Sequence, residues 1–203
     1  MRRGLSSRNK AGKCTVSRII GQGKIEIKAN CMNLVLINGP CGVGKSTAAT
    51  TLHQSMPLSF LVEIDAIRRL ISGYNDYAEE TSRNSFSVTL AIIDTYLQIG
   101  HDVIVEKMMR DETRLDSMIA LAKQRGAHVT EIILWARKDF ILKRANDRGY
   151  RKDSLLTPEK CERFWNEIDA IKDKRQGAIV IDVEKFSLDA VVEQIKTAMN
   201  LYM

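Results

Sequence analysis

Short apolar runs alternate with longer amphipathic stretches along most of this 203-residue chain. The apolar runs fall at residues 34–38, 59–64, 102–106, 129–136 and 178–183. Stretches with helical periodicity follow them at residues 45–55, 66–72, 82–99, 112–125, 138–147, 158–173 and 187–201. Runs this short and apolar are typical of buried strands. The alternation therefore predicts an α/β fold in which helices cover both faces of a five-stranded parallel sheet, in three layers.

The first 31 residues do not share this pattern. Residues 1–30 contain eight Lys and Arg residues and one Glu, a net charge of +7, whereas the whole chain carries +6. The rest of the chain is therefore nearly neutral. We expect residues 1–31 to be a basic, flexible N-terminal extension with one short strand at "KIEI", and residues 32–203 to form the main α/β domain.

Three explanations of this basic extension remain open. It can be an arm that binds phosphates, or an Arg- and Ser-rich targeting segment. The third explanation, which we favour, is that translation normally begins at Met32, directly before the first core strand. Nucleic-acid binding is expected only through this extension.

Composition excludes several classes of protein. The uncharged stretches contain Gly, Pro, His, Ser and Thr, so no run resembles a membrane-spanning helix, and no secretory signal is visible. The cysteines Cys14, Cys31, Cys41 and Cys161 show neither a CxxC pair nor zinc-site spacing. We therefore expect a cytoplasmic protein with reduced thiols and no membrane partner.

One motif points directly to chemistry. Residues 39–46, "GPCGVGKS", have the GxxxxGKS spacing of a phosphate-binding loop between a strand and a helix. Glycines allow a left-handed turn whose N–H groups point at phosphate oxygens, and the helix dipole adds positive charge. The predicted nucleotide-binding residues are Gly39, Pro40, Cys41, Gly42, Val43, Gly44, Lys45, Ser46 and Thr47.

Acidic residues follow the second and third strands, at the sheet edge where the phosphates are expected. Glu63 and Asp65 lie on one side of the strand by period-two alternation, and a carboxylate there can orient or deprotonate an attacking hydroxyl. The alternative for Asp65 is to cap the following helix. Glu106 ends the third strand, so it and Ser46 are the predicted Mg²⁺ ligands. Arg110 is a candidate for binding an anionic group of the substrate.

A basic stripe follows the fourth strand. Arg144, Arg148 and Arg151 recur at helical spacing, and "DRGYRKDSLLTP" is predicted to be a mobile loop between two helices. We predict a small helical lid at about residues 144–160, whose arginines stabilise the transferring phosphoryl group and exclude water. A solvated basic helix face is the alternative.

Taken together, "GPCGVGKS", "DAIR", "EKMMR" and "RANDR" resemble motifs of small P-loop kinases of the nucleoside-monophosphate-kinase-like group. This group includes adenylate, shikimate and gluconate kinases and chloramphenicol phosphotransferase, and the resemblance spans residues 33–200. It implies that Asp65 and Arg68 contact the acceptor. It also implies that Arg144 and Arg148 are the arginine pair of the lid, and that the loop of residues 183–185 runs beside the adenine.

The resemblance implies an ATP-dependent phosphotransferase that uses Mg²⁺ and a small-molecule acceptor. "EKMMR" lacks the family's aspartate, glycine and proline, which disfavours a nucleoside monophosphate and favours the phosphotransferases that act on hydroxyls of small molecules, including the antibiotic-modifying ones. The predicted catalytic residues are Lys45, Asp65, Arg144 and Arg148, and the predicted substrate-binding residues are Asp65, Arg68 and Arg110. A GTPase is disfavoured because the NKxD motif is missing, and an ABC ATPase because LSGGQ is missing. Two alternatives remain: a nucleotide-dependent regulatory ATPase module and a polynucleotide kinase-like enzyme.

Overall fold

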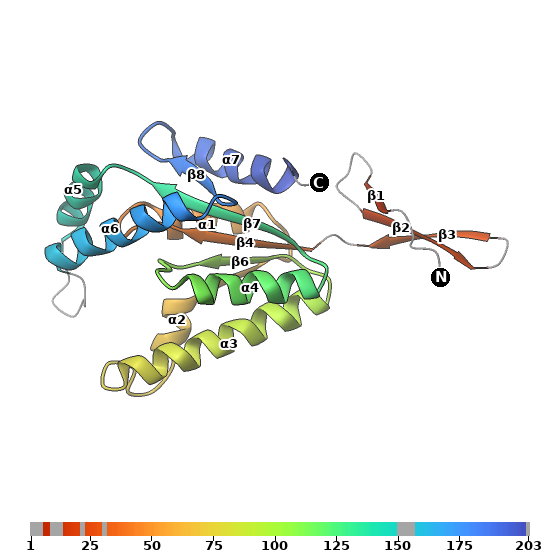
Figure 1. Ribbon diagram of the computed structural model, residues 1–203, viewed down its shortest axis with the longest axis horizontal. Coiled ribbons are helices and arrows are strands. Elements are labelled where there is room, and N and C mark those ends of the chain that lie inside the picture. Colours follow the sequence, from red (N-terminus) through yellow and green to blue (C-terminus); the bar gives the residue numbers. More distant parts are fainter. Residues whose placement is uncertain (1–5, 9–13, 21–22, 30–31, 150–156, 202–203) are drawn as a thin grey trace.

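A computed structural model describes residues 6–8, 14–20, 23–29, 32–149 and 157–201 of the chain (Figure 1). Its main sheet has five strands, all parallel, in the order β5-β6-β4-β7-β8. These strands are β4 (Asn33–Asn38), β5 (Phe60–Glu63), β6 (Val103–Glu106), β7 (His128–Trp135) and β8 (Ile179–Asp182). Each lies within two residues of a predicted apolar run, and the predicted parallel α/β fold is confirmed.

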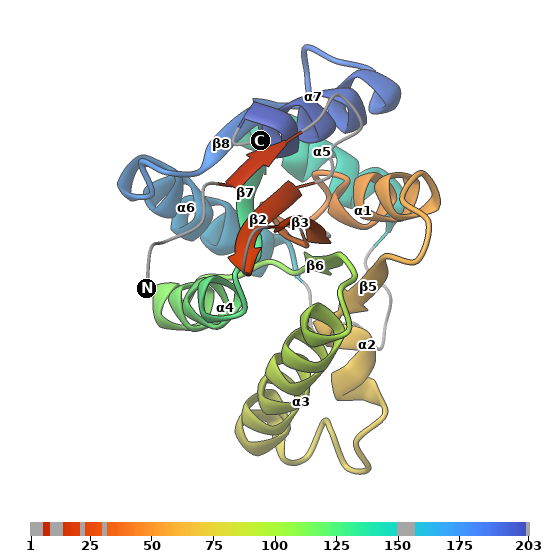
Figure 2. The same cartoon turned by 90° about the vertical axis from the view of Figure 1, so that its right-hand side faces the viewer.

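Helices pack on both faces of this sheet. They are α1 (Lys45–Gln54), α2 (Ile64–Arg69), α3 (Ala78–Gln98), α4 (Glu112–Gln124), α5 (Lys138–Arg148), α6 (Pro158–Lys174) and α7 (Leu188–Leu201). Figure 2 looks along the sheet and shows α1 and α7 on one side and α4 and α6 on the other. Among the helices that the structure describes, none is long and apolar enough to cross a membrane.

The central strand β4 shows why the sheet is covered on both faces. Val35 and Ile37 pack with buried residues of α1 and α7, whereas Leu34 and Leu36 pack with those of α3 and α4. All four side chains are fully buried. A strand with four consecutive apolar residues buries side chains on both faces, which requires a sheet that is covered on both sides.

The N-terminal strands form a second sheet. β1 (Ser6–Arg8), β2 (Cys14–Ile20) and β3 (Gly23–Ala29) pair antiparallel in the order β1-β2-β3. The strand expected at "KIEI" lies within β3, whereas β1 and β2 were not expected. The β-branched content of "CTVSRII" is the signal that could have revealed β2.

A buried ion pair ties three elements of the main domain together. Arg175, at the C-cap of α6, donates from Nε and Nη2 to both carboxylate oxygens of Glu131 on β7, the second at 2.9 Å. Its Nη1 lies 3.0 Å from Asp116 on α4. The side chains of Arg175 and Glu131 are only 12% and 7% exposed. These contacts fix the end of α6 against β7 and α4.

We expect Arg175→Met to destabilise the protein by about 3–5 kcal/mol, because the buried Glu131 carboxylate would lose its partner. Urea unfolding at neutral pH measures this loss. The double variant Arg175→Met/Glu131→Leu should recover most of the stability, because no buried charge then remains unpaired. A single variant as stable as the natural protein would show that the pair contributes nothing.

Candidate active site

The phosphate loop has the conformation that its glycines predicted. Gly39, Gly42 and Gly44 adopt φ values of 149°, 77° and 108°, in the region that L-residues avoid. A Cβ on Gly39 would overlap the carbonyl oxygen of Leu134 on β7. The loop can therefore lie this close to β7 only if residue 39 is glycine. The loop opens directly into α1, which no side chain caps in the described part of the chain. The N-terminal N–H groups of α1 therefore suit an anion.

Lys45 is the first residue of α1 and is buried. Its Nζ donates a hydrogen bond of 3.0 Å to the carbonyl oxygen of Pro40 within the loop. Burial lowers the pKa of Lys45, and the nearby carboxylate of Glu106 opposes that shift. The ammonium is thus held over the loop at the position where phosphate oxygens would replace the carbonyl.

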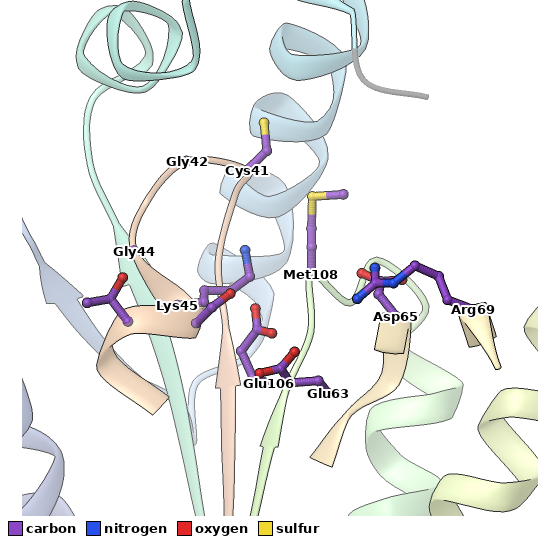
Figure 3. Close-up of a pocket in the computed structure, with 11 residues that line it drawn as sticks. Cys41, Gly42, Gly44, Lys45, Glu63, Asp65, Arg69, Glu106 and Met108 are labelled. Atoms are coloured by element: carbon purple, nitrogen blue, oxygen red, sulfur yellow. The ribbon is translucent and has the colours of Figure 1, made fainter. Parts of the chain in front are cut away.

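The ends of β5 and β6 bring carboxylates to this lysine. Glu63 and Glu106 are paired residues on the neighbouring parallel strands. Together with Asp65 they line a cavity of about 380 Å³ that also contains Lys45 and Ser46, which we call the phosphate-loop cavity. Figure 3 shows Glu63 and Glu106 side by side below Lys45.

Glu106 is electrostatically the most constrained of these acids. Burial raises its pKa above the ordinary glutamate range, and Asp65 and Glu63 raise it further by repulsion. The Lys45 ammonium and a hydrogen bond with the Ser46 side chain act in the opposite direction. Among the described residues, no three His, Cys, Asp or Glu side chains form a group able to hold a metal ion. The structure brings the predicted Mg²⁺ ligands Ser46 and Glu106 together in the lining of the phosphate-loop cavity.

Asp65 lies at the cavity, although not for the reason that the sequence suggested. β5 ends at Glu63, which is the N-cap of α2, so Asp65 belongs to the first turn of that helix. Capping of the helix by Asp65 is therefore wrong. Its carboxylate instead forms an ion pair with Lys107, the residue after β6. Sequence analysis did not identify Lys107, because nothing local links two residues that are 42 positions apart.

Arg68 and Arg69, neighbours in the last turn of α2, face different surroundings. The Arg68 guanidinium donates to Thr81 Oγ1 and to the carbonyl oxygens of Tyr74 and Ala78, so it holds α2 against the start of α3. It does not line the phosphate-loop cavity; Arg69 does, beside Asp65 (Figure 3). The rotation of α2, which begins two residues earlier than expected, decides which arginine faces the loop.

A second cavity of about 430 Å³ adjoins the first, and Met108 lines both. It contains four basic side chains and one acidic side chain, and we call it the basic cavity. The charged residues of its lining are Arg68, Lys107, Arg110, Asp111 and Arg114. Ser82 and Phe86 also line it, from the segment of residues 72–90.

Arg110 is held at the rim of the basic cavity. Its Nη1 donates a hydrogen bond of 2.8 Å to Glu167 on α6, and its guanidinium lies 4.5 Å from the centre of the Phe164 ring. Arg114, which the sequence analysis did not single out, bonds Ser82 and stacks over Phe86. The predicted substrate-binding residues Arg68 and Arg110 therefore share one cavity, with Lys107 and Arg114 as further members.

A third cavity, of about 300 Å³, lies on the other side of the phosphate loop and is lined mostly by apolar side chains. We call it the apolar cavity. Val183 and Phe186 border it, and Gly44 and Thr47 are shared with the phosphate-loop cavity. Glu184 accepts the backbone N–H of Arg137 at 2.6 Å, which ties the loop after β8 to the start of α5.

Arg144 also lines the apolar cavity, so α5 does bring this arginine beside the loop. Its guanidinium stacks over Phe140, 5.5 Å from the ring centre. Arg148 is the last residue of α5, and its side chain lies outside the described structure. Arg151 and residues 150–156 of the predicted lid also lie outside the described residues.

Asn38 is a structural residue that the sequence analysis missed. It ends β4 and is fully buried. Its side-chain oxygen accepts the N–H groups of Gly39 and Met109, and its Nδ2 donates to the carbonyl oxygen of Met109 at 2.9 Å. This amide joins the phosphate loop to the segment that carries Lys107 and Arg110. A polar residue closing an apolar strand was the available signal.

Comparison with solved structures finds several P-loop kinases. The Deinococcus radiodurans tunicamycin resistance protein matches with 26% identity over 82% of this chain and 94% of that chain, at a TM-score of 0.57. A gluconokinase from Sinorhizobium meliloti 1021 matches with 16% identity over 86% and 97%, at a TM-score of 0.58. Shikimate kinase from Aquifex aeolicus vf5 matches with 20% identity over 82% and 96%, at a TM-score of 0.59. The predicted resemblance to small P-loop kinases is therefore confirmed, and the gluconokinase and shikimate kinase matches show a shared fold.

The search of the curated proteins found no match. A family model described as an AAA domain matches residues 34–167, from β4 into α6. That range holds the phosphate loop, all three cavity carboxylates and the four basic side chains of the basic cavity. Because the match spans more than half of the chain, this protein belongs to the AAA domain family.

Proposed function

We propose that this protein is an ATP-dependent phosphotransferase that transfers the γ-phosphate to a hydroxyl or phosphate group of a small molecule. The observation that carries the proposal is the arrangement of three adjoining cavities. The apolar cavity shares Gly44 and Thr47 with the phosphate-loop cavity, which in turn shares Met108 with the basic cavity. A base, a polyphosphate and an acceptor could then lie in sequence along one edge of the sheet.

The nucleotide would lie across the first two of these cavities. Loop amides and Lys45 would bind the phosphates, and Val183 and Phe186 would contact the base in the apolar cavity. Arg144 reaches this region from α5 and, with Arg148, would neutralise charge on the transferring phosphoryl group.

Ser46 and Glu106 would hold Mg²⁺, with water and phosphate oxygens completing its coordination. When bound, this ion neutralises charge on the β and γ phosphates and orients them. The hydroxyl of Ser46 and the carboxylate of Glu106 fit such an ion because both supply oxygen atoms and both residues line the phosphate-loop cavity.

Asp65 is the carboxylate best placed to act on the acceptor. Its side chain is 57% exposed and lies between the phosphate-loop cavity and Lys107, which lines the basic cavity. Glu63 is instead the strand partner of Glu106, the predicted Mg²⁺ ligand. We therefore assign Asp65 to orient or deprotonate the attacking hydroxyl, with Lys107 holding its carboxylate in place.

The basic cavity favours an acceptor that carries an anionic group. Its four basic side chains already contact Asp65, Glu167, Asp111 and polar atoms of α3, so they are positioned rather than loose. A phosphate or carboxylate group could exchange with these contacts without requiring new backbone positions.

The proposal is tested by measuring ADP release with MgATP across a panel of acceptors. We expect an anionic acceptor, such as a sugar acid, to stimulate release, and Lys45→Ala to abolish it. Tunicamycin belongs in the panel because the protein at 26% identity is a tunicamycin resistance protein. ATP binding without stimulation by any acceptor would instead support a regulatory ATPase module.

Asp65→Asn should lower kcat by about 100- to 10,000-fold, the usual contribution of a general base, with little change in ATP affinity. Steady-state kinetics and nucleotide titration separate the two effects. Asp76→Asn is the matched control, since Asp76 is exposed and outside the described cavities. Undiminished turnover in the Asp65 variant would remove this residue from the mechanism.

The pH dependence of kcat/KM for MgATP should report Glu106. Mg²⁺ needs the ionised carboxylate, and the pKa of Glu106 is raised, so kcat/KM should begin to fall at a pH above the ordinary glutamate value of about 4.3. Glu63→Gln removes one repulsive charge and should shift this acid limb to lower pH. An acid limb that is unchanged in both Glu63→Gln and Glu106→Gln would contradict the assignment.

A further inference from the structure

Two cysteines that are distant in the sequence meet beside the phosphate loop. Cys41 is the third residue of the loop, and Cys161 lies in the first turn of α6. Their sulfur atoms are 2.8 Å apart although 120 positions separate the residues. Cys161 is fully buried and Cys41 is half-buried. Figure 3 shows the Cys41 side chain pointing away from Glu106 and Glu63.

Phosphate binding does not account for a cysteine at this place. The GxxxxGKS spacing leaves position 41 unconstrained, and the loop would bind phosphate through its backbone amide there. Cys41 lines the phosphate-loop cavity, and its sulfur also lies 4.0 Å from the carbonyl oxygen of Cys161, so this position of the loop is in contact with α6.

We propose that Cys41 and Cys161 form a reversible disulfide that links the phosphate loop to α6. A disulfide has an S–S length of about 2.05 Å, so the sulfurs need to approach by less than about 1 Å. Neither the loop nor the helix has to unfold for a shift of that size. Such a pair is a modification site for oxidants of the small-molecule disulfide class.

The oxidation proceeds by two thiol–disulfide exchanges. The thiolate of Cys41, the more accessible residue, attacks one sulfur of the small-molecule disulfide and releases one thiol. The thiolate of Cys161 then attacks the Cys41 sulfur of this mixed disulfide and releases the second thiol. The protein loses two electrons and two protons, and the small-molecule disulfide gains them as two thiols.

The bond would constrain the helices that face the loop. α6 is joined to the β7 end by a 2.8 Å hydrogen bond from Trp165 to Ala136, and to α5 by the ion pair of Lys138 and Glu162. α5 packs on the loop near Gly42 and carries Arg144. Oxidation would therefore fix the positions of α5 and α6 relative to the phosphate loop.

The functional consequence rests on the proposed function. If Arg144 must move onto the transferring phosphoryl group, the disulfide should slow turnover while leaving nucleotide binding nearly unchanged. A misplacement of about 1 Å costs up to about 100-fold in rate, so we expect turnover to fall at least about tenfold in the oxidised protein.

The test uses the full chain with Cys14→Ser and Cys31→Ser, so that only Cys41 and Cys161 remain. After incubation with oxidised glutathione we expect the intact mass to decrease by two hydrogen atoms and peptide mapping to show the 41–161 cross-link. The melting temperature should rise, on the order of 10 °C, because the bond closes a long loop. Dithiothreitol should restore the mass, remove the cross-link and lower the melting temperature again. The matched control with a further Cys161→Ser should give only a glutathione adduct on Cys41.

The disulfide proposal would be wrong if both thiols could still be alkylated after this treatment, in the folded protein and in the protein unfolded with urea. ADP release is then compared between the oxidised and reduced forms. Equal turnover would overturn the functional consequence, while the mass and melting results still establish the modification site. A reduced protein that turns over no acceptor would refute the proposed function alone, because mass, mapping and melting do not depend on activity.

Discussion

The close approach of the phosphate loop to β7 is the constraint on which the rest of the site depends. Only glycine at position 39 allows the chain to pass the Leu134 carbonyl and turn into α1. Asn38, one residue earlier, uses its amide to bind Met109 and so fixes the segment after β6 beside the loop. Three strand ends are thereby held in register, and the side chains that follow them converge.

Burial then determines the charge states of the side chains that meet beside the loop. Lys45 and Glu106 have pKa values shifted towards their neutral forms by desolvation, and each partly restores the other's charge. The arrangement costs stability unless further charges enter the site. A polyphosphate with a divalent cation would supply both signs of charge at once, which is why we regard the site as built for such a ligand.

The helix α6 contacts several parts of the site. Its C-cap residue Arg175 is buried against Glu131, Glu167 holds Arg110 at the basic cavity, and Trp165 bonds the end of β7. Cys161 reaches the phosphate loop itself. A change in the position of α6 would therefore affect both the phosphate-loop cavity and the basic cavity.

By itself the sequence determined the five strands of the main sheet, most helix boundaries, the phosphate loop and the acidic residues at the ends of β5 and β6, because hydrophobic period and motif spacing are local properties. Tertiary structure alone decided that Arg69 rather than Arg68 faces the loop, since this depends on where α2 begins. It also decided the partnerships of Asp65 with Lys107 and of Cys41 with Cys161. Such contacts arise from how the strands are ordered in the sheet and how α6 packs across it, and no local pattern encodes either.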